Sequence, residues 1–279
     1  MVTRTRHAFS GLLLAACVAA STAGAQGMPA GAPTGLPAAS GATRGPTDAQ
    51  VFWILQNLSP ESAKPLGALV NALLTDTAGH MQMAERRAAT SADSARAAGI
   101  VRTMRASLAP YSDVAAAERD GYQLFLPWLD EQVIYHYNNM RNAASARVGF
   151  DATKPTSLLY RKDAKGQKVL VGAMYTAPAS ANPAELDARL PTSIAFWHEH
   201  VNFCAMRPEL AGAGLKQANA TMFARWLAIE TPEACTAAGG LFIPRLFGWM
   251  AHVNAFDGDS PGAIWGSDGR DHMNMHHSH

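Results

Sequence analysis

The chain has 279 residues, of which 48% are hydrophobic and 16% charged, so it has enough apolar material to bury a core. Its formal net charge of +1 argues against a nucleic-acid-binding surface and against a polybasic membrane patch. Because it contains only three cysteines and ten histidines, the positions of these residues are informative.

The N-terminus has the features of an export signal. Two arginines precede the apolar run GLLLAACVAASTA, and AGA then predicts cleavage of a signal peptide comprising residues 1–25. The alternative is a lipobox, LAAC, which would shorten the signal to residues 1–16 and leave a lipid on Cys17. Residues 26–47 are rich in Gly, Ala and Pro and predict a flexible linker. We therefore expect a periplasmic or extracellular protein, attached to a membrane only if the lipobox is used.

Residues 48–121 show the apolar spacing of helices. In 59–79, leucines and a valine recur on one helical face. A second helix is expected from the N-cap Ser91 to the residue before Pro110, because proline interrupts helices. Its buried stripe is expected to comprise Ile100, Val101, Met104 and Leu108. A shorter helix is expected between Ser112 and Gly121.

Residues 122–268 consist of short β-branched or aromatic runs separated by turn residues. Strands are expected within 132–138, 156–162, 167–177, 192–204 and 246–256. Asp163 and Gly166 predict a hairpin loop between two of these strands. The sequence thus predicts one α+β domain over residues 48–268, in which an N-terminal helical section packs on an antiparallel β core.

Two cysteines remain outside the signal segment. Cys204 and Cys235 form an even pair in a chain expected to reach an oxidising compartment, which predicts a disulfide. Cys235 lies in a short helix expected to start at the N-cap Thr231 and to end at Gly239. The alternative for Cys204 is a role as a metal ligand.

Two stretches, FWHEHVNFC and GWMAHVNAF, nearly repeat each other. Because side chains alternate along a strand, His198 and His200 are expected on one face. In the second stretch His252 is expected to share a face with Met250. If the two strands are neighbours, three imidazoles converge on one transition metal ion, and His136 of YHYNN is the natural fourth ligand. Without a metal, these residues would be buried polar groups satisfied by hydrogen bonds.

Other residues extend this metal hypothesis. Asn202 and Asn254 follow the two histidine motifs and are expected to fix imidazole tautomers. HMQM at residues 80–83 and the tail at 269–279, which is expected to be disordered, mix imidazole with thioether. That mixture favours copper, because soft sulfur selects Cu(I). On this hypothesis the candidate secondary metal donors are His80, Met81, Met83, Met250, His272, Met273, Met275, His276, His277 and His279. The alternatives are a helix end with two packing methionines for residues 80–83 and a metal-free polar end for the tail.

The blocks YHYNN, PTSLLY, LVGAMY, WHEHVNFC and GWMAHVN also carry a resemblance. Through them the chain resembles a family of uncharacterised exported bacterial proteins, over roughly His80 to Trp265. The resemblance implies that His80 and the four central histidines lie inside recurring blocks, whereas the tail lies outside them. It implies no activity.

These observations favour an exported protein that binds a transition metal, copper first and zinc second, through His136, His198, His200 and His252. One alternative is a metalloenzyme, an oxidase or a hydrolase, that uses an open position at the same site. Glu199 is expected on the opposite strand face from the histidines, so no carboxylate is placed as its general base. Another alternative is a metal-free module that binds a ligand or a protein partner through its aromatic strands.

Overall fold

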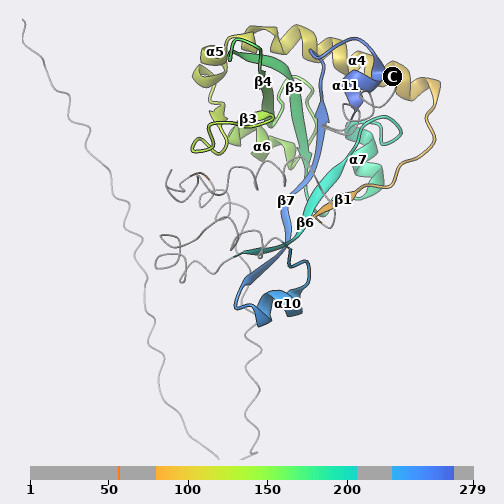
Figure 1. Ribbon diagram of the computed structural model, residues 1–279. Coiled ribbons are helices and arrows are strands. Elements are labelled where there is room, and N and C mark those ends of the chain that lie inside the picture. Colours follow the sequence, from red (N-terminus) through yellow and green to blue (C-terminus); the bar gives the residue numbers. More distant parts are fainter. Residues whose placement is uncertain (1–55, 57–79, 206–227, 267–279) are drawn as a thin grey trace, which may run out of the picture. The chain divides into compact units, whose positions relative to one another are not determined.

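In the part of the chain that the structure describes, seven antiparallel strands form one sheet in the order β1-β6-β7-β5-β4-β3-β2 (Figure 1). The computed structural model describes residue 56 and residues 80–205 and 228–266. The strands are β1 (Met81–Met83), β2 (Gln123–Leu124), β3 (Tyr135–Asn138), β4 (Ser157–Lys162), β5 (Lys168–Ala177), β6 (His198–Ala205) and β7 (Leu241–Val253). The predicted α+β class with an antiparallel core is confirmed. The helix predicted in residues 59–79 lies outside the described residues.

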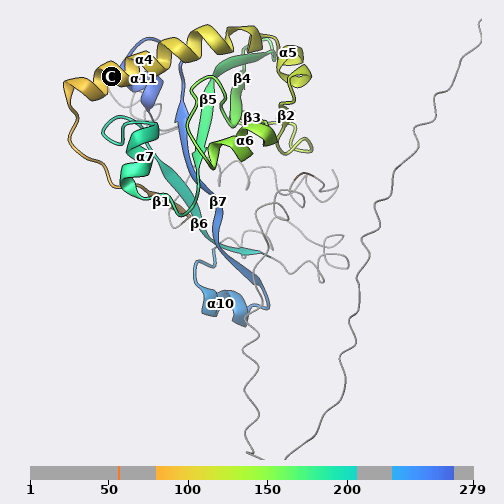
Figure 2. The same cartoon turned by 180° about the vertical axis from the view of Figure 1, so that it is seen from behind.

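Among the described residues, the helices are short except for one. They are α4 (Ser91–Leu108), the 3-10 helix η2 (Ala109–Ser112), α5 (Val114–Arg119), α6 (Met140–Ala146), α7 (Pro183–Arg189), α10 (Pro232–Ala237) and α11 (Pro261–Trp265). Figures 1 and 2 show α4 running across the strands, with α10 at the far end of the β6–β7 ribbon. No helix within the described ranges is long and apolar enough to cross a membrane.

The helix starts show where local sequence signals succeed and fail. The predicted N-cap Ser91 is wrong by one residue, because Thr90 accepts from the Asp93 backbone and the Asp93 side chain accepts from the Thr90 backbone. This reciprocal capping box satisfies two donors at once, which a cap at the next residue would not do. The cap of α5 is likewise Asp113 rather than the predicted Ser112. Thr231 caps α10 as predicted.

Strand bounds also differ from the expectation. The strand predicted in 192–204 begins only at His198, because residues 191–195 form a turn in which the Pro191 carbonyl accepts from Ile194 and Ala195. Residues 81–83 form β1 and pair with β6, so HMQM is not a helix end. The loop predicted at Asp163 and Gly166 is present: the Asp163 carboxylate accepts from two loop amides, and Gly166 has a φ of 77°.

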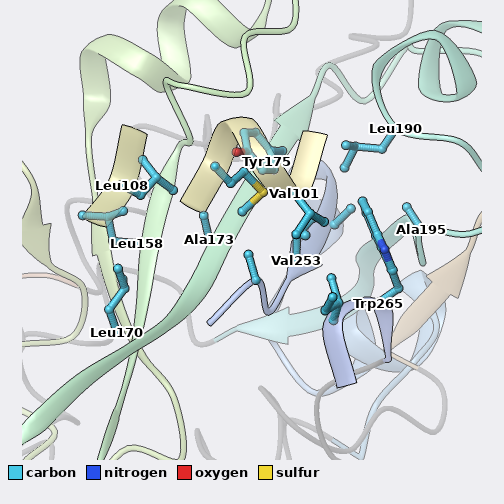
Figure 3. Close-up of a cluster of buried hydrophobic side chains, with 14 of the residues drawn as sticks. Val101, Leu108, Leu158, Leu170, Ala173, Tyr175, Leu190, Ala195, Val253 and Trp265 are labelled. Carbon is cyan, nitrogen blue, oxygen red and sulfur yellow. The ribbon is translucent and has the colours of Figure 1, made fainter. Parts of the chain in front are cut away.

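One face of the sheet, called the core face below, packs against α4, α7 and α11 (Figure 3). Three of the four residues predicted as the stripe of α4 (Val101, Met104 and Leu108) are buried there, and Ile100 packs at its margin. The sheet side of this cluster includes Tyr135, Tyr137, Leu158, Tyr160, Leu170, Ala173, Tyr175, Ala177, Trp197, Trp249, Ala251 and Val253. This apolar packing fixes which way each strand faces.

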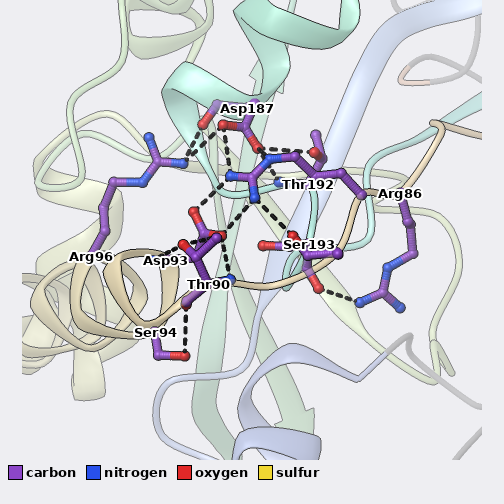
Figure 4. A network of polar contacts seen from close by, with 10 residues as sticks. Arg86, Thr90, Asp93, Ser94, Arg96, Asp187, Thr192 and Ser193 are labelled. Atoms are coloured by element: carbon purple, nitrogen blue, oxygen red, sulfur yellow. Dashed lines mark hydrogen bonds and ion pairs between the residues drawn. The ribbon is translucent and has the colours of Figure 1, made fainter.

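A polar network joins the start of α4 to α7 (Figure 4). The guanidinium of Arg87 donates to both carboxylate oxygens of Asp93 at 2.6 Å and to those of Asp187 at 2.9 and 3.0 Å. Arg96 of α4 donates to the Asp187 backbone carbonyl. Hydrogen bonding to Arg87 holds the pKa of Asp93 far below its usual range, so this carboxylate stays ionised at neutral pH.

Candidate metal site

The face opposite the core face carries the predicted metal ligands. Directly opposed residues of an antiparallel pair project to the same side of a sheet. His198 opposes Met250 across β6 and β7, and His252 opposes Met174 across β7 and β5. Met174 and Met250 belong to an apolar cluster separate from the core, together with Leu159. We call this side of the sheet the histidine face.

Four imidazole rings on this face form a row in which each ring is close to the next. The ring centroids of His136 and His252 are 5.4 Å apart, those of His252 and His198 are 5.4 Å apart, and those of His198 and His200 are 5.6 Å apart. We call these four residues the histidine row. The structure therefore brings together all four residues predicted as the principal ligands, from strands β3, β6 and β7.

The contact between His136 and His252 requires the sheet to curve. Strands β3 and β7 are separated by β4 and β5, and three inter-strand spacings amount to about 14 Å on a flat sheet. Ring centroids 5.4 Å apart therefore mean that the sheet bends and that the two rings lean together. Gly172 lies in β5, one of the two strands between them, and pairs with Leu159 of β4. Because it has no side chain, it leaves room for the two rings to approach each other. The histidine face is thus concave at the row.

This spacing suits shared ligation, but the row is not a preformed ligand sphere. Imidazole nitrogens about 2 Å from a tetrahedral ion place neighbouring ring centres about 5 Å apart, close to the observed values. In the described residues, however, no group of three or more His, Cys, Asp or Glu side chains is arranged to hold an ion. The row supplies neighbouring imidazoles whose ring orientations do not yet converge.

Burial determines the charge state at one end of the row. Burial, together with the positive charge that His252 and His80 can carry, lowers the pKa of His200 to about 4. At neutral pH this imidazole is therefore uncharged, the form in which a ring nitrogen can ligate a metal.

Backbone carbonyls face the Nδ1 atoms of two histidines. The His80 Nδ1 lies 3.1 Å from the Val201 carbonyl, and the His198 Nδ1 lies 3.3 Å from the Phe196 carbonyl. A proton on each Nδ1 would be donated to that carbonyl and would leave Nε2 as the ligating atom. The tautomer-fixing role assigned to Asn202 and Asn254 stays a prediction.

The two cysteines and His80 each have a defined partner in the structure. Cys204 and Cys235 form a disulfide, which confirms that prediction and excludes Cys204 as a thiolate ligand in this state. His80 is buried and stacks on Phe203 with ring centroids 4.8 Å apart. Cys17 and the six tail donors lie outside the described residues.

Two features of this region were not predicted from the sequence. Met174 stands opposite His252, and its only sequence signal is a methionine in the apolar run of a predicted strand. Glu199 is fully buried, with the Arg245 Nε 3.3 Å from its carboxylate. Burial raises the pKa of Glu199 and Arg245 opposes that shift. Glu199 pairs with Gln82, between the pairs formed by His198 and His200, so its side chain lies on the opposite face of β6 from the two histidines.

The fold and the site together define a class: an α+β protein whose antiparallel sheet buries aromatic residues on one face and carries a row of histidines on the other. No known protein family, curated protein or solved structure matches the chain. The chemistry of the histidine row is thus the basis for assigning a function.

Proposed function

We propose that this is an exported protein that binds a transition metal, copper before zinc, through His136, His198, His200 and His252. The observation that carries the proposal is the histidine row itself. Four of the five histidines in the described ranges come from three strands and meet at ring spacings of 5.4 to 5.6 Å. Two of these rings, those of His198 and His200, are buried, and removing polar rings from water costs free energy, which a shared metal ion would offset.

Metal binding would need only local side-chain motion. The χ2 torsion of histidine is broad, so an imidazole can turn within its site without a change of backbone. His198, His200 and His252 would supply three nitrogens from the adjacent strands β6 and β7. His136 would close the set from β3, across the concavity of the sheet.

Export is the second part of the proposal. A disulfide persists in an oxidising compartment such as the periplasm or the cell exterior, and the Cys204–Cys235 bond is compatible with that location. It also ties the C-terminal end of β6, the strand that carries His198 and His200, to α10.

The test is metal analysis of the mature chain lacking residues 269–279, purified without a nickel column, followed by titration with copper and zinc. We expect one tightly bound ion per chain, lost in His200→Ala. The matched control is Glu199→Gln on the same strand, which should retain the ion because Glu199 does not share the histidine face. A chain that binds neither metal would contradict the proposal and favour a metal-free binding module.

A further inference from the structure

The strand pairing places a methionine opposite every strand histidine of β6 and β7. The pairs are His200 with Met81, His198 with Met83 and Met250, and His252 with Met174. These methionines come from three different strands, β1, β5 and β7, so no local sequence repeat produces the pattern. Since opposed residues share a face, the thioethers and the imidazoles lie on the same side of the sheet.

This use of methionine is selective. The described ranges contain six methionines, and four of them occupy these positions. The other two are elsewhere: Met104 is buried in the core and Met140 is exposed at the start of α6. Packing alone would be served as well by leucine, which the core face uses at Leu158 and Leu170.

The positions permit joint coordination. The Cβ atoms of opposed residues lie about 4.5–5.5 Å apart, and the methionine side chain has three rotatable bonds. A sulfur in these positions can therefore reach an ion held by the opposite imidazole. The exposed fraction of these methionine residues decreases from 37% for Met83, on the edge strand β1, to 5% for Met250, which pairs with His198. An ion that enters from solvent would therefore contact the thioethers of β1 first, and then the imidazoles and thioethers of β6 and β7.

The donors determine the ion. Imidazole and thioether are both neutral, and the acid nearest in sequence, Glu199, alternates to the other side of β6. A buried divalent ion without an anionic ligand is costlier than a monovalent one, because the uncompensated charge is larger. Thioether sulfur is a soft ligand that selects Cu(I), whereas zinc prefers nitrogen, thiolate and carboxylate.

From this geometry we infer that the histidine row binds Cu(I) in mixed imidazole–thioether coordination, with Met81, Met83, Met174 and Met250 as the sulfur donors. The inference rests on the proposed metal-binding function and specifies its ion. It distinguishes this site from an all-imidazole site, which would accept zinc equally well.

The test uses the full mature chain, with ascorbate as the reductant so that the disulfide stays intact. Cu(I) affinity is measured by competition with bicinchoninate, and Zn(II) affinity by competition with a zinc chelator. Met250→Leu and the double variant Met81→Leu/Met83→Leu should each weaken Cu(I) binding by about tenfold or more, with Zn(II) binding unchanged. The matched controls Met104→Leu and Met140→Leu should change neither affinity. Because the tail carries imidazole and thioether donors of its own, each variant is measured both in the full mature chain and in the chain lacking residues 269–279, and the comparison is made within each pair.

The outcomes separate the two proposals. Unchanged Cu(I) affinity in the methionine variants, or zinc binding without Cu(I) binding, would overturn the mixed coordination and leave the metal-binding function standing. Binding of neither ion by the unmodified chain would overturn both. The double variant alters only edge positions, so it tests the inference even where circular dichroism shows that Met250→Leu does not fold.

Discussion

At Gly172 the backbone of β5 lies close against the backbone at the end of β7. A Cβ atom added there would lie 2.3 Å from the Val253 carbonyl oxygen and 2.7 Å from the Asn254 Cα. Both are backbone atoms, so no side-chain rotation can relieve the overlap. In Gly172→Ala, the end of β7 must therefore move away from β5, where Val253 pairs with Ala173 and His252 with Met174.

The expected cost can be assembled from two contributions. Overpacking of a close contact costs about 1–3 kcal/mol, and disturbing the end of the β5–β7 ladder adds about 1 kcal/mol per hydrogen bond lost. With one such bond lost, we expect Gly172→Ala to lower the free energy of unfolding by about 2–4 kcal/mol. For a domain of this size that corresponds to a melting temperature lower by about 10 °C.

The assay is urea denaturation followed by tryptophan fluorescence, with Gly99→Ala as the matched control. Gly99 lies inside α4, and the nearest atom to an added Cβ is the flexible Arg102 side chain at 3.8 Å. That variant should gain about 0.5–1 kcal/mol, because alanine is the better helix former. If Gly172→Ala is as stable as the unmodified protein, the close approach of β5 and β7 is refuted.

Two further predictions concern stability. Thiol labelling of the unfolded, unreduced mature protein should find no free Cys204 or Cys235, and replacing both by serine should cost about 4 kcal/mol, as chain entropy gives for a sequence separation of 31 residues. Two labelled thiols per chain would contradict this. Asp93→Asn should destabilise the protein at pH 7, where the carboxylate binds Arg87 and caps α4 through Thr90. Because folding lowers the pKa of Asp93, this stabilisation is present above the unfolded pKa of about 4 and is lost as pH falls below it. Urea titrations at pH 7 and pH 3 should show the difference between the two proteins shrinking; a constant difference would argue against an ionised Asp93.

Local chemistry explains which parts of the fold could be predicted. Turns and caps depend on a few adjacent residues, so the Asp163–Gly166 loop and the start of α10 at Thr231 were predictable. The exact ends of helices were less predictable. Thr90 and Ser91 are both suitable N-caps, and only the reciprocal pair of hydrogen bonds with Asp93 selects Thr90.

The histidine face was only partly predictable for a different reason. Alternation along one strand places His198 and His200 together without any knowledge of the fold. The approach of His136 to His252 depends on strand order and on sheet curvature, which are non-local. Met174 was missed because its significance comes only from the pairing of β5 with β7. Strand pairing is non-local, so it cannot be predicted from the residues of one segment at a time.

The tryptophans of the two near-repeats explain how the row keeps its register. Trp197 and Trp249 are both buried in the core, and the Trp197 indole donates to the Leu190 carbonyl. Successive side chains of a strand point to opposite faces. With Trp197 and Trp249 fixed on the core face, His198 and Met250 must lie on the histidine face, where they oppose each other. A slip of one residue would expel a tryptophan from the core and bury an imidazole in its place, at a cost of several kcal/mol. The repeated tryptophan therefore stabilises the donor pattern from the opposite face of the sheet.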